Sequence, residues 1–124
     1  MNRSGLVVAG LVAIAWSAGL AAIELSAQGK GDAKAGGTVF TVQCAKCHGD
    51  AGAGDGREAA KLKDKPGSWT AGGGGLQGMD DQKIYDAIAK GGPAVGKARS
   101  MPSYPKLSEA DIWNLVAYVK TLKR

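Results

Sequence analysis

The sequence contains few of the side chains from which most redox and metal sites are built. Its 124 residues include one histidine and two cysteines, and a structural zinc site needs four Cys or His ligands. Aromatic residues make up 6% of the chain and 20 residues are glycine, so a core built from side chains alone would be thin. No alternating pattern near the cysteines indicates a β-strand. A domain this small commonly depends on a cross-link or a bound group for stability.

The scarce residues occur together in the stretch Cys44-Ala45-Lys46-Cys47-His48. The spacing C-x-x-C-H is typical of a covalent haem attachment site. Two thiols one helical turn apart can each form a thioether with a porphyrin vinyl group, and the histidine that follows can offer a ring nitrogen to the iron. A buried macrocycle would also supply the packing surface that the aromatic-poor chain lacks.

Two other interpretations of the cysteine pair stay open. A C-x-x-C pair can be a thiol–disulfide redox centre, although that motif usually sits in a βαβ setting, and no strand pattern surrounds it here. Neighbouring cysteines of an exported protein can also form a plain disulfide. Of the three interpretations, we expect haem attachment.

The first 27 residues are typical of a targeting segment. Arg3 provides a short positive region, and residues 5–23 carry no charge. This apolar stretch is longer than the roughly 7–15 residues of a secretory signal and close to the about 20 residues of a spanning helix. We expect residues 1–27 to be a cleaved signal peptide, with an uncleaved N-terminal membrane anchor as the alternative. Residues 28–124 would then form one exported domain in the periplasm.

The remaining residues predict an all-α domain with three main helices and long glycine-rich loops around one covalently attached haem. Each helix begins at a possible N-cap residue: residues 32–48 at Asp32, residues 80–91 at Asp80 and residues 108–122 at Ser108. Residues 49–79 include ten glycines. A loop of this length is uncommon in a compact domain unless it is functional. We therefore expect it to wrap around the edge of a large flat ligand, with disorder as the alternative.

The second axial ligand of the iron must be another residue type, because the chain has one histidine. The thioether of methionine is a natural partner, and Met/His ligation raises the reduction potential. Met79 and Met101 are the candidates outside the targeting segment. Met79 can make an apolar contact at the start of the second helix, whereas Met101 lies in a loop that Pro102 stiffens. We expect Met101 to bind the iron, with Met79 or an open position as alternatives.

Between about residue 32 and residue 122 the chain resembles the class I c-type cytochromes, which are small proteins with one haem. The matching features are Gly36 and Phe40 ahead of the attachment motif, the Met-Pro loop, and Leu115 with Tyr118 in the last helix. The resemblance implies the cytochrome c fold, in which the N- and C-terminal helices cross, here through these four residues.

The resemblance also implies a set of residues around the haem. Two would form thioethers and two would be axial ligands of the iron: Cys44 and Cys47, then His48 and Met101. In the family a proline carbonyl holds the other ring nitrogen of the histidine, which fixes its tautomer. Pro66 is the candidate for that role here. Trp69 would either donate a hydrogen bond to a haem propionate or pack against its surroundings.

An iron with both axial positions filled by protein has no place for a substrate, which leaves the transfer of single electrons as its chemistry. We therefore expect a periplasmic monohaem electron carrier and not an enzyme. Three alternatives stay open. They are the haem subunit of a membrane or periplasmic dehydrogenase or oxidase complex, a haem enzyme or gas sensor in which Met101 is not a ligand, and a thiol oxidoreductase.

The net charge of +5 predicts redox partner proteins with acidic docking surfaces, because complementary charges steer association. The basic residues expected near the haem are Lys46, Lys61, Lys63, Lys65, Lys90, Lys97, Arg99 and Lys106. An ordinary solvated surface is the alternative. Nucleic acid is not expected, because the basic residues are dispersed and no reading motif is present. Contact with a membrane is expected only if residues 1–27 are retained as an anchor.

Overall fold

The structure is a computed structural model that describes residues 30–70 and 72–123. These residues form helices, turns and loops, without a strand, and the all-α prediction is confirmed. In chain order the helices are α1 (Ala33–Gln43), α2 (Ala45–His48), the 3₁₀ turn η1 (Ala59–Lys61), α3 (Asp81–Lys90), the 3₁₀ turn η2 (Gly92–Val95) and α4 (Glu109–Leu122). The targeting segment predicted for residues 1–27 lies outside the described part of the chain. No helix in the described part is long and apolar enough to cross a membrane.

The three long helices begin where the sequence predicts. The Asp32 carboxylate accepts hydrogen bonds from the backbone N–H groups of Lys34 and Ala35 at 2.8 and 3.3 Å. Asp80 accepts one from the backbone of the first turn of α3 at 2.8 Å, and the Ser108 hydroxyl does the same for α4 at 3.1 Å. These side chains satisfy N–H groups that have no partner inside the helix.

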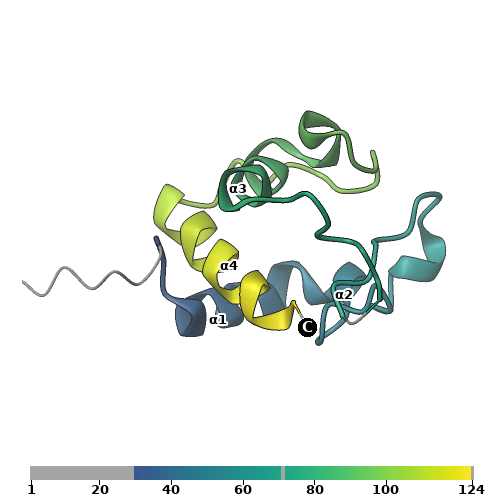
Figure 1. The fold of residues 1–124 in the computed structure, drawn as a ribbon, viewed down its shortest axis with the longest axis horizontal. Helices are drawn as coiled ribbons and strands as arrows, with labels where there is room; N and C mark the ends of the chain where they lie inside the picture. Colours follow the sequence, from purple (N-terminus) through teal and green to yellow (C-terminus); the bar gives the residue numbers. More distant parts are fainter. Residues whose placement is uncertain (1–29, 71, 124) are drawn as a thin grey trace, which may run out of the picture.

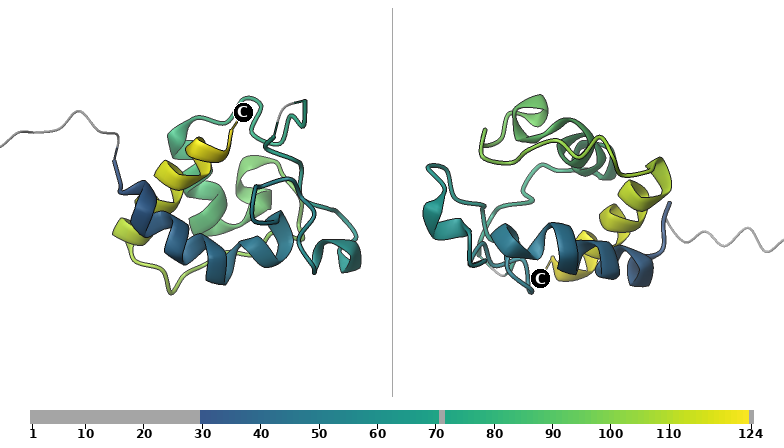
Figure 2. Two further views of the ribbon diagram at one scale, coloured as in Figure 1. Left: turned by 90° about the horizontal axis from the view of Figure 1, so that it is seen from below. Right: turned by 180° about the vertical axis from the view of Figure 1, so that it is seen from behind.

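The first helix differs in one respect from the single segment that was expected. α1 ends at Gln43 and α2 begins at Ala45, with Cys44 between them at φ −112° and ψ −38°. The Cys44 amide still donates to the Phe40 carbonyl at 2.8 Å. The two helices therefore follow one another with only a local distortion at the first cysteine (Figure 2).

α1 and α4 cross one another, as expected (Figure 1). A side chain at Gly36 would collide with the backbone carbonyl of Asn114, so the two helix backbones are in direct contact there. Phe40 and Leu115 are fully buried on either side of this contact. The Tyr118 ring is tilted against Phe40, with 5.0 Å between ring centroids. The crossing of the N- and C-terminal helices is confirmed.

α4 also packs against α3, so it joins the two halves of the molecule. In Figures 1 and 2, α1 and α2 lie on one side, and α3, η2 and the green segment that follows them lie on the other. The Lys120 ammonium of α4 pairs with the Asp81 carboxylate of α3 at 2.9 Å. The buried core extends across both halves and consists of Phe40, Ala45, Leu76, Ile84, Ile88, Ile112, Leu115, Val116 and Val119.

The glycine-rich segment between α2 and α3 has a defined path. Its first part folds back over the end of α2, where the amides of Gly54, Gly56 and Glu58 donate to the carbonyls of His48, Cys47 and Lys46 at 2.8, 3.2 and 2.8 Å. Gly54 has φ +77°, a backbone conformation that glycine adopts without strain. These bonds use carbonyl groups that the short helix leaves free. The described part of this segment is therefore ordered, and its wrapping around the edge of a ligand stays a prediction.

Candidate functional site

One cavity of about 240 Å³ lies between the two halves of the molecule. Its lining includes every residue that the sequence predicts for the site, namely Cys44, Cys47, His48, Pro66, Trp69 and Met101, together with the alternative ligand Met79. The rest of the wall is mainly apolar and includes Phe40, Leu62, Leu76, Ile84, Ile88, Leu115 and Val119. The fold therefore brings together predicted site residues that are up to 57 positions apart in the sequence.

The two cysteines lie on one wall of this cavity, at the junction of α1 and α2. The amides of Cys47 and His48 both donate to the Cys44 carbonyl, at 3.1 and 3.0 Å. This single helical turn keeps the two thiols and the imidazole on adjacent positions of one wall. Both thiols are free.

Burial raises the pKa of the Cys44 thiol from 9.0 to about 11, although the positive charge of Lys46 acts in the opposite direction. Catalytic and redox-active cysteines generally have a lowered pKa, because the thiolate is the nucleophile. The environment of Cys44 therefore favours a neutral thiol and does not favour thiol–disulfide exchange.

His48 lies in the cavity wall, and burial keeps its imidazole neutral. Burial lowers its pKa from 6.5 to about 4. The neutral imidazole is the form that can bind a metal ion through a ring nitrogen. Its Nδ1 atom is inaccessible to solvent and has no hydrogen-bond partner among residues 30–70 and 72–123.

Pro66 lies in the cavity wall. The carbonyl oxygen lies against Gly54, on the side where a side chain would project. No hydrogen bond joins His48 Nδ1 to the Pro66 carbonyl within the described residues, and the role that the resemblance implies for Pro66 stays a prediction. The indole of Trp69 stacks on the imidazole of His48, with 4.4 Å between the two ring centroids.

The segment that carries Met101 is anchored to the end of α3. The Gly92 amide donates to the Met101 carbonyl at 3.1 Å, and the Met101 amide donates to Ala98 at 3.2 Å. A side chain at Gly92 would approach the Met101 Cβ to 3.3 Å. These contacts form a short closed loop that presents Met101 to the cavity. Met79 lies in the same cavity wall, so the choice between the two sulfurs stays a prediction.

Tyr104 is a cavity residue that the sequence reasoning missed. Its hydroxyl donates to the Gln43 carbonyl at 3.4 Å, and its amide donates to the Ile88 carbonyl at 3.1 Å. Tyr104 therefore connects the Met101 segment to α3 and to the end of α1. Burial raises its pKa, and the nearby cysteines add to this effect. The only sequence signal was an aromatic residue shortly after the Met-Pro pair, which by itself is ambiguous.

The donor set and the mainly apolar lining of the cavity fit a covalently attached haem. Two thiols and a neutral imidazole share one wall, methionine side chains are present in the same cavity, and the rest of the wall is mainly apolar. By contrast, no group of three or more His, Cys, Asp and Glu side chains in residues 30–70 and 72–123 is arranged to hold a bare metal ion. Haem needs two thiols for attachment and one imidazole for the iron, and the chain provides these.

Comparison with known proteins gives a consistent result. The family model "Cytochrome c" matches residues 33–123. Among solved structures, a similar fold occurs in a chain of the Kuenenia stuttgartiensis reducing HAO-like protein complex Kustc0457/Kustc0458, with a TM-score of 0.58 and 24% sequence identity. The alignment covers 75% of this chain and 43% of that chain, so this chain spans less than half the length of the structure it matches. A search of the curated proteins finds no match.

Proposed function

The chain belongs to the cytochrome c family and binds one haem c covalently, and from this premise we propose that it is a periplasmic electron carrier with His48 and Met101 as axial ligands. Cys44 and Cys47 would hold the haem through thioether bonds. When bound, the haem iron supplies reversible one-electron oxidation and reduction.

The observation that carries this proposal is the buried, neutral imidazole in a cavity whose wall also contains methionine. Burial that keeps the pKa of His48 at about 4 leaves the imidazole unprotonated at neutral pH. Thioether and imidazole together suit an iron that changes charge by one electron with little rearrangement. Apolar side chains make up most of the wall around both ligands. With two protein ligands in place, a substrate would have no position on the iron, and the protein would pass electrons without catalysing a reaction.

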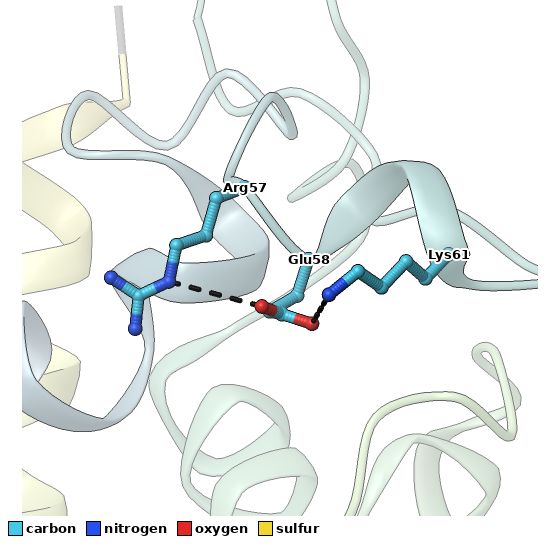
Figure 3. Close-up of polar contacts among 3 residues, drawn as sticks. All are labelled: Arg57, Glu58 and Lys61. Carbon is cyan, nitrogen blue, oxygen red and sulfur yellow. Dashed lines mark hydrogen bonds and ion pairs between the residues drawn. The ribbon is translucent and has the colours of Figure 1, made fainter.

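The charges around the cavity bear on the partner. Lys65 and Lys97 line the cavity itself, together with one carboxylate, Asp64. Lys61, in contrast, forms an ion pair with Glu58 at 2.9 Å, and Arg57 approaches the same carboxylate at 3.8 Å (Figure 3). The hydrogen bond and the charge of Lys61 lower the pKa of Glu58, which therefore stays ionised.

Lys90, another of the basic residues expected near the haem, also has its charge neutralised, because it pairs with Asp86 at 3.1 Å. The proposed docking surface for an acidic redox partner therefore includes fewer basic residues than the sequence analysis named. Lys65 and Lys97 lie at its centre. Exposed charges of this kind mainly raise the association rate, and salt screens them.

A second candidate function is the haem-carrying part of a larger oxidoreductase complex. The observation that favours it is that the similar solved structure is a chain of a protein complex and is more than twice as long as the matching region. Co-purification with a larger partner, or retention of residues 1–27 as an anchor, would support this candidate over a freely diffusing carrier.

The test compares two single substitutions, Met101→Ala and Met79→Ala, in protein matured with haem. We expect Met101→Ala to abolish the weak sulfur-to-iron charge-transfer band of the oxidised protein and to lower the reduction potential, because the iron loses its thioether ligand. Met79→Ala should keep the band and reduce only the stability of the α3 end.

The reverse result would show that Met79 is the ligand. A purified, matured protein without the absorption bands of haem c would refute the whole proposal. Ready binding of carbon monoxide or cyanide to the unmodified protein would instead indicate an open iron position, as in a haem enzyme or gas sensor.

A further inference from the structure

The rings of His48 and Trp69 form the most nearly parallel aromatic pair in the described residues. Their centroids are 4.4 Å apart and their planes differ by 27°. The other pairs, such as Phe40 with Tyr118 at 49°, are tilted. A histidine ring can rotate about its Cβ–Cγ bond with a broad torsional preference. Rotation of His48 away from its observed plane would break the contact between the two ring faces.

Trp69 is itself held on several sides. Its amide donates to the Gly52 carbonyl at 2.7 Å. The benzene part of the indole lies against Gly52, at a position where a side chain would bring atoms to 2.5 Å from the ring. Phe40, which is fully buried, lies on another side with its centroid 6.0 Å from the indole. The indole is therefore held in place by its neighbours, and the imidazole stacks on it.

No hydrogen bond holds His48 Nδ1 within the described residues. Histidines that bind metals usually have such a bond, and it fixes the direction of the ring. In this structure the ring face of Trp69 is the contact that restricts the imidazole plane instead. The stacked indole opposes rotation of the imidazole plane, which is the motion that a hydrogen bond from Nδ1 would otherwise oppose.

We propose that Trp69 is a positioning residue that sets the rotation of the His48 imidazole about its bond to the haem iron. This inference rests on the proposed function, in which His48 is an axial ligand. The plane of an axial imidazole determines how its π orbitals overlap with the iron d orbitals. Loss of the stack should therefore alter the magnetic anisotropy of the oxidised protein, whether or not overall stability changes.

The experiment uses the oxidised, haem-loaded full chain and records the principal g values by low-temperature electron paramagnetic resonance. The variants are Trp69→Leu and Trp69→Phe. The matched controls are Trp113→Leu and Trp113→Phe. Trp113 is also partly buried and packs on Tyr85 with 4.7 Å between centroids, but it does not line the cavity.

We expect a shift of the g values that is largest in Trp69→Leu, smaller in Trp69→Phe, and absent in both Trp113 variants. Thermal stability should fall at both positions, because each substitution removes packed aromatic surface. Reduction potentials measured on the same samples should change only for the Trp69 variants.

Unchanged g values in the Trp69 variants would overturn the inference and leave Trp69 as a packing residue. If Trp69→Leu does not mature, the comparison of Trp69→Phe with Trp113→Phe decides the question by the same criterion. A wild-type spectrum without a low-spin signal from His and Met ligands would refute the proposed function first, and the inference with it. These failures are distinguishable, since one concerns the variants and the other the unmodified protein.

Discussion

Replacing Gly36 by alanine has two effects of opposite sign on the free energy of unfolding. On an exposed helix position this change stabilises by about 1 kcal/mol, because alanine has the higher helix propensity. At Gly36, however, the new Cβ would overlap the backbone carbonyl of Asn114 and approach the Leu115 amide nitrogen to 3.0 Å. A backbone group cannot rotate away, so α1 and α4 must move apart along their whole contact.

Overpacking of a close-packed interior typically costs about 1–3 kcal/mol. The clash at Gly36 is with the backbone of α4, and the fully buried side chains of Phe40 and Leu115 lie beside it. We therefore expect a cost at the upper end of that range, even after the stabilisation from the higher helix propensity of alanine. A loss of about 3 kcal/mol corresponds to a fall of roughly 12–24 °C in the melting temperature of a domain of this size.

The matched control is Gly37→Ala, one position along the same helix. Its new Cβ would meet only the Tyr118 side chain, at 3.0 Å, and a ring can shift by a few tenths of an ångström. We expect the free energy of unfolding to change by less than about 1 kcal/mol, because the higher helix propensity of alanine and the tight contact with Tyr118 nearly cancel. The assay is urea unfolding of the haem-loaded protein, followed by circular dichroism. Equal effects of the two substitutions, or stabilisation by Gly36→Ala, would refute the close crossing of α1 and α4.

Three further predictions concern hydrogen bonds and protonation. Asn114→Ala removes the acceptor of the Asp32 amide, which donates to Asn114 Oδ1 at 2.7 Å, and should lower the free energy of unfolding by about 1 kcal/mol in urea titrations. Asp80→Ala removes the N-cap of α3 and should also cost about 1 kcal/mol, whereas the exposed Gln82→Ala should change stability by less than about 0.5 kcal/mol. The third prediction follows from His48, whose pKa burial lowers from 6.5 to about 4. The unfolded chain takes up a proton below pH 6.5 and the folded chain does not until about pH 4, so the contribution of His48 is complete above pH 6.5 and is lost on acidification. The free energy of unfolding should fall by about 3 kcal/mol between these pH values, in the direction that iron binding also favours, and an increase on acidification would contradict the buried, neutral imidazole.

Features that depend on neighbours in the sequence could be predicted from the sequence alone. Asp32, Asp80 and Ser108 cap their helices because a carboxylate or hydroxyl reaches N–H groups only two or three residues away. The pair Cys44 and Cys47 with His48 is likewise a local arrangement, set by one helical turn. The all-α class followed from these signals together with the absence of strand patterns.

The crossing of α1 and α4 was also accessible, although it joins distant segments. Gly36 has no side chain at a position where helical periodicity places it on the same face as Phe40, and this pattern indicates a close helix contact. The resemblance to c-type cytochromes identified Leu115 and Tyr118 as the other side of the contact. The structure confirms both and adds Asn114, whose carbonyl is the group that excludes a side chain at Gly36.

Tertiary structure alone decided which residues meet across the cavity. Trp69 is 21 positions from His48 in the sequence, and its indole reaches the imidazole only because the glycine-rich segment returns over α2. The same return turns the Pro66 carbonyl towards Gly54. Tyr104 likewise reaches Gln43 across the molecule. Contacts of this kind depend on the path of a loop, and a loop's path results from many weak backbone hydrogen bonds that no short motif encodes.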